Sequence, residues 1–131
     1  MTEASAGPRG QLTTRTIAMP ADANPSGDIF GGWVLSQMDL AAGICAGKRA
    51  RGRVATIAID AMKFIKPVFV GDVMSVYAVL ARSGRTSMTL HIEAWAERER
   101  FGESVQVTEA QFTFVAIDEA GKTRPLPALE S

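Results

Sequence analysis

Residues 31–49 read GGWVLSQMDLAAGICAGKR, and this stretch decides the fold. Its residue pattern is helical, and its apolar side chains occupy nearly every angular direction instead of one stripe. These side chains are Trp33, Val34, Leu35, Met38, Leu40, Ala41, Ala42, Ile44 and Cys45. A helix that is apolar on all sides is a buried helix. The sequence therefore predicts one central helix that other elements must cover.

The segments on both sides of this helix are predicted to be strands. The predicted strands cover residues 11–19, 54–66, 72–82, 86–97 and 105–118. In 86–97, apolar and polar residues alternate strictly, as in a strand with one buried face. Ser83, Gly84 and Arg85 precede it and suit the tight turn of a hairpin. In 105–118 the alternation changes phase near Thr108, which predicts a bulge.

This order of elements predicts an α+β fold in which a single antiparallel sheet curves around the helix. We expect a flexible arm at 1–10, a single domain at 11–127 and a short tail at 128–131. One sheet cannot cover the whole circumference of the helix. The uncovered side would expose apolar residues, so we expect a partner subunit.

Composition excludes several classes of partner. The 131 residues include 14 basic and 14 acidic ones, so the formal net charge is zero. Broad electrostatic attraction to nucleic acid or to an anionic membrane is therefore not expected. There is one cysteine, so no intrachain disulfide can form. The opening residues lack the pattern of a signal peptide, and we expect a cytoplasmic protein.

The sequence lacks several familiar catalytic patterns. Its one histidine, His91, falls on the polar face of a predicted strand, where we expect an exposed surface residue and no catalytic triad. Cys and His do not cluster with zinc spacing, and calcium and phosphate-loop motifs are missing. We therefore expect no metal and no cofactor.

The entry to the helix could bind a carbonyl group. Gly31 and Gly32 stand where the preceding loop becomes helical. Backbone N–H groups at a helix N-terminus have no partner within the helix, and glycine lets another group approach closely. Such N–H groups stabilise a carbonyl oxygen that gains negative charge. Asp28, just before this point, is expected to cap the helix.

Asp39 is the candidate catalytic group. It follows Gly32 by nearly two helical turns and stands among apolar residues. A carboxylate in such surroundings is costly unless it is paired or used. Two interpretations remain open from the residues alone. Asp39 either performs chemistry or makes a structural hydrogen bond to Ser36, Gln37 or a neighbouring strand.

The sequence also resembles the YciA-type acyl-CoA thioesterases of the hotdog superfamily. The resemblance extends in collinear order from Arg15 to Pro127. The stretches that carry it are RTIAMPADAN (15–24), GDIFGGW (27–33), SQMD (36–39), GRV (52–54), FIKPV (64–68), VGDV (70–73), GRTS (84–87) and FVA (114–116). One departure is Ser26, where the family has asparagine.

This resemblance implies a hotdog fold, with a five-stranded antiparallel sheet wrapped around the helix. It also implies hydrolysis of acyl-CoA to coenzyme A and a carboxylic acid, without a further cofactor. Two subunits would pair edge to edge, and three such dimers would form a hexamer. The active site would lie at the dimer interface, so the dimer would be the smallest active unit.

By the same resemblance, the catalytic acid falls on Asp39, acting as general base or as nucleophile. Asn24 would face the Asp39 of the partner subunit, and the N–H groups of Gly31 and Gly32 would hold the thioester carbonyl. Residues expected to bind coenzyme A are Arg85, Thr86, Ser87, Lys63, Lys66 and Phe64. The alternative function is a non-catalytic acyl-CoA-binding or regulatory module. A hotdog dehydratase is disfavoured because it would need a histidine near the helix entry.

Overall fold

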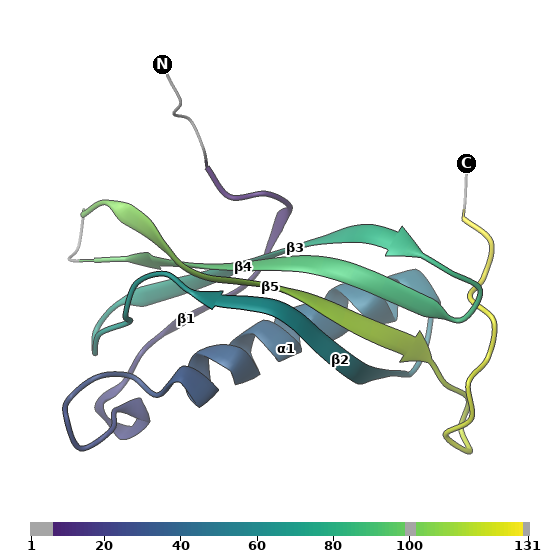
Figure 1. Cartoon of the computed structure of the whole chain (residues 1–131), viewed down its shortest axis with the longest axis horizontal. Coiled ribbons are helices and arrows are strands. Elements are labelled where there is room, and N and C mark those ends of the chain that lie inside the picture. Colours follow the sequence, from purple (N-terminus) through teal and green to yellow (C-terminus); the bar gives the residue numbers. More distant parts are fainter. Residues whose placement is uncertain (1–6, 99–101, 130–131) are drawn as a thin grey trace.

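The computed structural model describes residues 7–98 and 102–129. One helix lies across a five-stranded antiparallel sheet, whose strand order is β1-β3-β4-β5-β2 (Figure 1). The elements are β1 (Gln11–Ile17), the short 3-10 helix η2 (Pro20–Asp22), α1 (Gly31–Ala50), β2 (Val54–Phe64), β3 (Val73–Ser83), β4 (Ser87–Glu97) and β5 (Ser104–Ala116). The predicted α+β hotdog arrangement is confirmed. Residues 1–6 of the predicted arm and 130–131 of the predicted tail lie outside the described residues.

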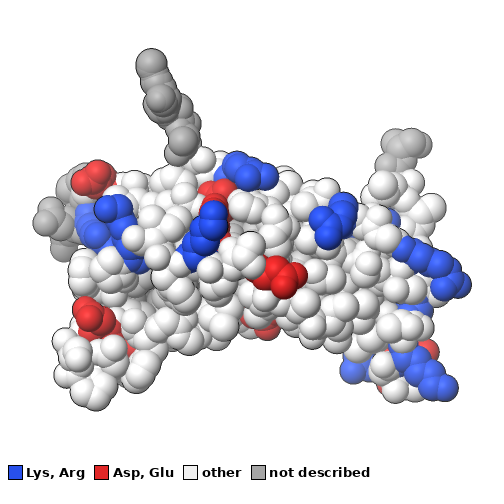
Figure 2. Space-filling model, in the orientation of Figure 1, with Lys and Arg blue, Asp and Glu red and all other residues white. Residues whose placement is uncertain are grey.

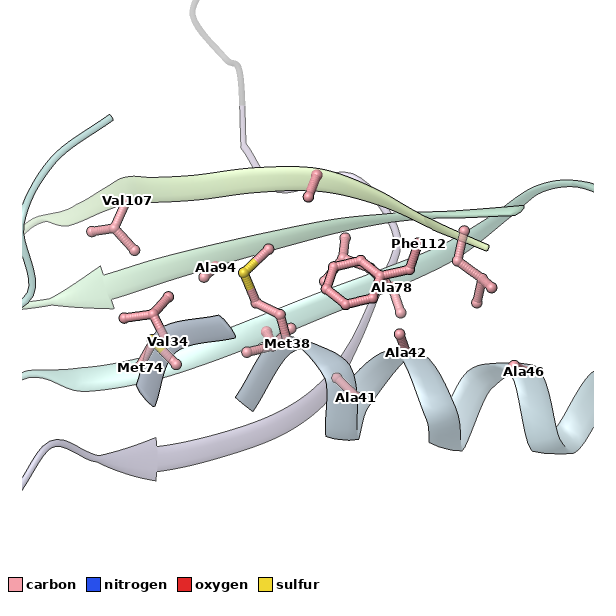
Figure 3. Close-up of a cluster of buried hydrophobic side chains, with 14 of the residues drawn as sticks. Val34, Met38, Ala41, Ala42, Ala46, Met74, Ala78, Ala94, Val107 and Phe112 are labelled. Carbon is pink, nitrogen blue, oxygen red and sulfur yellow. The ribbon is translucent and has the colours of Figure 1, made fainter. Parts of the chain in front are cut away.

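One face of α1 packs on the sheet. Figure 3 shows Val34, Met38 and Ala42 of the helix on the side that faces Phe112 and the other sheet residues. Small alanines at four of the six buried helix positions let the helix lie close to the strands. These buried positions are Val34, Met38, Ala41, Ala42, Ala46 and Ala50. The helix is therefore part of the core, as its composition predicts.

The opposite face of α1 is uncovered in the single chain. Leu40 is 59% exposed and Ile44 is 46% exposed. An exposed apolar face of this kind is typical of a surface that another subunit covers.

The predicted bulge in β5 is confirmed. The β4–β5 register pairs Ala94 with Thr108 but Trp95 with Gln106, which leaves Val107 as the extra residue. The Val107 carbonyl instead accepts hydrogen bonds from the N–H groups of residues 65 and 66. The bulge thus anchors the chain where it leaves β2.

The sheet face that points away from the helix is partly buried as well. His91 and Glu93 alternate with core residues of β4, as predicted, but they are 6% and 4% exposed. The expectation that His91 is an exposed surface residue is therefore wrong. β4 is the central strand of the sheet, so its polar residues lie between those of β3 and β5. The Arg9 backbone N–H also reaches Glu93, at 3.4 Å.

Charges of both signs are spread over the molecule. Figure 2 shows Lys and Arg side chains concentrated toward the end where the C-terminus lies, with mixed signs elsewhere on that face. Arg51, Arg53 and Arg124 line a cavity at that end. Within the described part of the chain, the structure contains no helix of sufficient length and apolarity to cross a membrane.

Candidate active site on the exposed side of the helix

Asp39 is held by a residue of the neighbouring strand. The Thr56 hydroxyl in β2 donates a hydrogen bond of 2.8 Å to Asp39 Oδ1. Asp39 itself is half-buried near the middle of α1. An ionised carboxylate has about four acceptor positions, so one bond leaves capacity for a water molecule or a substrate. The neighbouring strand, one of the three partners expected from the sequence, is the one observed.

Asp39 and Thr56 lie beside an apolar patch. We use this name for Leu40 and Ile44 of α1 with Ile57 and Ile59 of β2, which are 38–59% exposed. β2 is also an edge strand of the sheet. An edge has unpaired N–H and C=O groups that can accept another strand. The carboxylate therefore stands next to a surface suited to a second subunit.

The N-terminus of α1 is open to a ligand. Its N-cap residue is Phe30, which makes no side-chain capping bond. The expectation that Asp28 caps the helix is wrong, because Asp28 lies two residues earlier and forms an isolated bridge with Phe69. A methyl group added at Gly32 would meet no atom within 4 Å, whereas one at Gly31 would lie 3.3 Å from the Phe64 ring.

The helix entry and Asp39 are not adjacent within one chain. Seven residues separate Gly32 from Asp39, which corresponds to about 10 Å of rise along an α-helix. One thioester carbon cannot contact both groups across that distance. A single subunit therefore does not bring the helix entry and Asp39 together, and their shared role in catalysis remains a prediction.

Asn24 organises the loop that leads into the helix. Its side-chain Oδ1 accepts hydrogen bonds from the N–H groups of Ser26 and Asp28, at 2.9 and 3.1 Å. Its own N–H donates to the Asp28 carbonyl at 2.7 Å. Within one chain Asn24 thus shapes the approach to Gly31. Its expected position opposite the partner's Asp39 remains a prediction.

The residues expected to bind coenzyme A fall into two groups at opposite ends of α1. Arg85, Thr86 and Ser87 follow the end of β3, where Leu126 N–H donates to the Arg85 carbonyl at 2.8 Å. The same C-terminal segment reaches the last turn of the helix, because an Arg124 guanidinium nitrogen donates to the Ala50 carbonyl.

The second group lies at the start of the helix. Phe64 ends β2 and contacts Gly31, as described above. Lys63 precedes it in the sequence, but the Lys63 ammonium approaches Glu109 on the sheet face opposite the helix, at 3.9 Å. The Lys66 backbone N–H is bound by the β5 bulge at 3.3 Å. A 20-residue helix is about 30 Å long. The structure therefore does not bring the two groups together in one chain.

Cys45 does not offer a competing nucleophile. Burial raises the pKa of its thiol above the usual value, and the nearby Lys48 ammonium partly opposes that effect. The thiolate is the reactive form of cysteine, and a raised pKa reduces its fraction at neutral pH. Asp39 remains the candidate of choice for the chemical step.

Thr56 is the functional candidate that sequence reasoning missed. Nothing in the alternation of β2 distinguishes its hydroxyl from those of other strand threonines. Its partner is 17 residues away, across the end of the helix and a turn. Only the packing of β2 along α1 identifies the pair.

Comparisons with known proteins identify the family of the chain. Residues 26–103 match the thioesterase superfamily. The chain is 49% identical over 123 residues to the acyl-CoA thioester hydrolase YciA of Salmonella typhimurium. The matched residues cover 92% of each of the two chains. A hexameric thioesterase from Yersinia pestis superposes with a TM-score of 0.89 at 51% identity, covering 93% of this chain and 99% of that one.

Two more distant structures are single-residue variants of one hydrolase. The acyl-CoA hydrolase of Staphylococcus aureus, in a threonine-to-alanine variant, superposes with a TM-score of 0.79 at 27% identity, covering 87% of this chain and 70% of that one. An aspartate-to-alanine variant of the same hydrolase superposes equally well. The two replaced positions of that protein are 17 residues apart.

Proposed function

The chain belongs to the YciA acyl-CoA thioester hydrolases of the thioesterase superfamily, and from this premise we propose how its residues divide the work of hydrolysis. Its reaction releases coenzyme A and a carboxylic acid from an acyl-CoA. The observation that carries the proposal is the Asp39–Thr56 hydrogen bond at the border of the apolar patch. A fixed carboxylate at an apolar surface is suited to act on a thioester once a partner covers that surface.

The proposed active unit is a dimer formed through β2. Antiparallel pairing of two β2 strands would satisfy both exposed edges and bury the apolar patch of each subunit. Because Thr56 of β2 holds Asp39, the β2 edge lies beside the candidate carboxylate, which supports this surface over the β1 edge. We further propose that three such dimers form a hexamer, the state of the Yersinia pestis thioesterase.

This pairing would complete the active site. In an antiparallel pair centred on the middle of β2, the Thr56 end of one strand lies beside the Phe64 end of the other. Phe64 contacts Gly31, so the helix entry of the partner would approach Asp39. The separation of about 10 Å within one chain is thereby removed. Asn24 lies in the same entry loop, so it too would approach the Asp39 of the other subunit.

The proposed chemistry uses three groups. The N–H groups of Gly31 and Gly32 of the partner subunit polarise the thioester C=O and stabilise the oxyanion. Asp39 then either takes a proton from the attacking water or attacks the carbonyl carbon itself to form a mixed anhydride, which water hydrolyses to release the carboxylic acid and restore Asp39. In both routes the C–S bond breaks and coenzyme A leaves as a thiolate, which is a good leaving group.

Thr56 would act as a positioning residue for Asp39. Its hydroxyl holds Oδ1 and so directs Oδ2 toward the substrate. The spacing of 17 residues between Asp39 and Thr56 equals that between the aspartate and threonine replaced in the Staphylococcus aureus hydrolase. This equality supports a shared arrangement in the two proteins.

The same dimer would unite the two groups expected to bind coenzyme A. Because the two helices run in opposite directions, the Arg85 end of one subunit would lie beside Phe64 and Lys66 of the other, whereas Lys63 faces Glu109 on the other side of the sheet. Cations from both chains would then face the phosphates of one coenzyme A molecule. A site shared between two subunits would account for the distance between the two groups within one chain.

Turnover of a panel of acyl-CoAs tests the proposal against a non-catalytic binding module. Released coenzyme A is measured with a thiol-reactive dye, and a Cys45→Ser variant removes the protein's own thiol signal. A hydrolase releases coenzyme A over many turnovers. Saturable acyl-CoA binding without release would reject hydrolysis and favour the binding module. The same panel measures acyl chain-length preference.

A further inference from the structure

A second cluster of reactive side chains lies on the sheet face opposite the helix. His91 and Glu93 of β4 and Glu109 of β5 each offer a ligand atom, and these atoms lie within 4.8 Å of one another. The apolar residues that alternate with them face α1 instead. The cluster is therefore separated by the sheet from Asp39 and from the apolar patch.

The two glutamates make an unusual pair. Glu93 and Glu109 are directly opposite in the β4–β5 register. Like charges at such positions are destabilising. Lys63 approaches Glu109 at 3.9 Å, but its side chain is 68% exposed and gives little compensation. His91 can supply at most one positive charge for two carboxylates, so a cation bound between them would stabilise the pair.

Each ligand group is already oriented. Trp95 Nε1–H donates to Glu93 Oε1 at 2.9 Å, and Gln106 Nε2 donates to Glu109 Oε1 at 3.1 Å. Glu93 Oε2 and His91 Nε2 share a 2.7 Å hydrogen bond, whose proton a metal ion would displace, and Glu109 Oε2 approaches the exposed Lys63 ammonium at 3.9 Å. Supporting hydrogen bonds of this kind fix the ligands of protein metal sites.

A cavity and a further oxygen adjoin the cluster. The cavity has a volume of about 260 Å³, and its walls include His91, Glu109 and Gln111 together with the cationic residues Arg9 and Lys63. Gln111 Oε1 is buried and accepts no hydrogen bond from the described residues. A buried oxygen of that kind is costly unless something satisfies it. The cavity has room for an ion with bound water.

We propose that His91, Glu93 and Glu109 bind a divalent transition-metal ion of the zinc class, with Gln111 Oε1 facing the ion or its bound water. One imidazole nitrogen and carboxylate oxygens suit this class, whereas Mg²⁺ prefers oxygen ligands alone. The ion neutralises the opposed glutamates and joins β4 to β5 on the polar face. The site takes no part in thioester hydrolysis and does not depend on the function proposed above.

Zinc titration of the metal-free oligomer by calorimetry tests the site. We expect one Zn²⁺ per chain, and at least about 10-fold weaker binding in His91→Asn and in Glu93→Gln, because loss of supporting groups alone costs 10–100-fold. Glu109→Gln, which alters a less buried residue, provides a third ligand variant if either of the others fails to fold. Mg²⁺ should not compete at equal concentration.

Three control variants distinguish this site from other donors. Glu97→Gln removes a carboxylate on the same strand and face, where Glu97 pairs with Arg15. Cys45→Ser and Asp39→Asn remove the thiol and the active-site carboxylate. All three should keep full zinc affinity. X-ray absorption of the zinc-loaded protein should show nitrogen and oxygen ligands at about 2.0–2.2 Å. Unchanged affinity in the ligand variants, or sulfur in the zinc shell, would overturn the proposal.

Discussion

The Thr56 hydroxyl donates a 2.8 Å hydrogen bond to Asp39 Oδ1. This bond joins β2, an edge strand of the sheet, to the middle of α1. The bond fixes a carboxylate at the border of an exposed apolar patch. Once a partner covers that patch, the carboxylate works in a drier environment, where electrostatic interactions are stronger.

Replacing Asp39 by asparagine should lower kcat by about 10²–10⁴-fold, the usual contribution of acid–base catalysis. The side chain keeps its shape, so the oligomer should keep its size in analytical ultracentrifugation. Steady-state kinetics with a short acyl-CoA measure the loss. Glu103→Gln, which removes an exposed carboxylate, is the control and should leave kcat unchanged. Near-normal turnover in Asp39→Asn would exclude both catalytic roles.

Replacing Thr56 by valine should lower kcat by about 10–100-fold, because a hydrogen bond to a charged group contributes about 1.5–3 kcal/mol. KM should change far less, since Thr56 orients Asp39 without binding coenzyme A. Thr56→Ser restores the hydroxyl and should restore most of kcat. A serine variant as impaired as the valine variant would point to a packing role for the threonine methyl group.

Charge placed on the β2 edge should separate the subunits and abolish activity. Ile57→Lys introduces an unpaired cation into the proposed interface, which is strongly unfavourable. Ile17→Lys on the β1 edge is the matched control, because Ile17 is 52% exposed and Ile57 is 57% exposed. Sedimentation and turnover are measured together. An active Ile57→Lys monomer would refute the shared active site.

Coenzyme A binding should weaken with salt. We expect KM to rise with ionic strength, since the Debye length falls to about 3 Å at 1 M, while kcat stays nearly constant. Arg85→Ala should raise KM at low salt and flatten this dependence. Lys122→Ala removes an exposed cation from the same end of the molecule and should do neither. A KM indifferent to salt would remove the electrostatic role of Arg85.

Ala61→Gly should stabilise the protein. Ala61 has a φ of 53° at the irregularity in β2, a left-handed conformation that costs a residue with a Cβ about 1–2 kcal/mol. Glycine removes that cost but loses more chain entropy, so the net gain should be about 0.5–1 kcal/mol. Urea unfolding at one fixed protein concentration measures it. Ala58→Gly, in ordinary strand conformation, should destabilise by a similar amount.

The sequence by itself determined the elements and their order. The helix expected at 31–49 is α1 (Gly31–Ala50), and the five expected strands match the observed ones within about two residues at most ends. The bulge near Thr108 was visible because a change of phase in the alternation has a local cause. Asp39 was recognisable because an acidic residue in an apolar stretch is costly wherever the helix packs.

Only the tertiary structure decided which residues meet. It identified Thr56 as the partner of Asp39 and buried His91 beside two glutamates. It also separated the residues expected to bind coenzyme A into two groups at opposite ends of α1. These contacts join segments from different strands and the helix, and their side chains carry no local sign of the pairing. Periodicity reports which face of an element a residue occupies. The register between elements, which determines what that face touches, exists only once the sheet has closed around the helix.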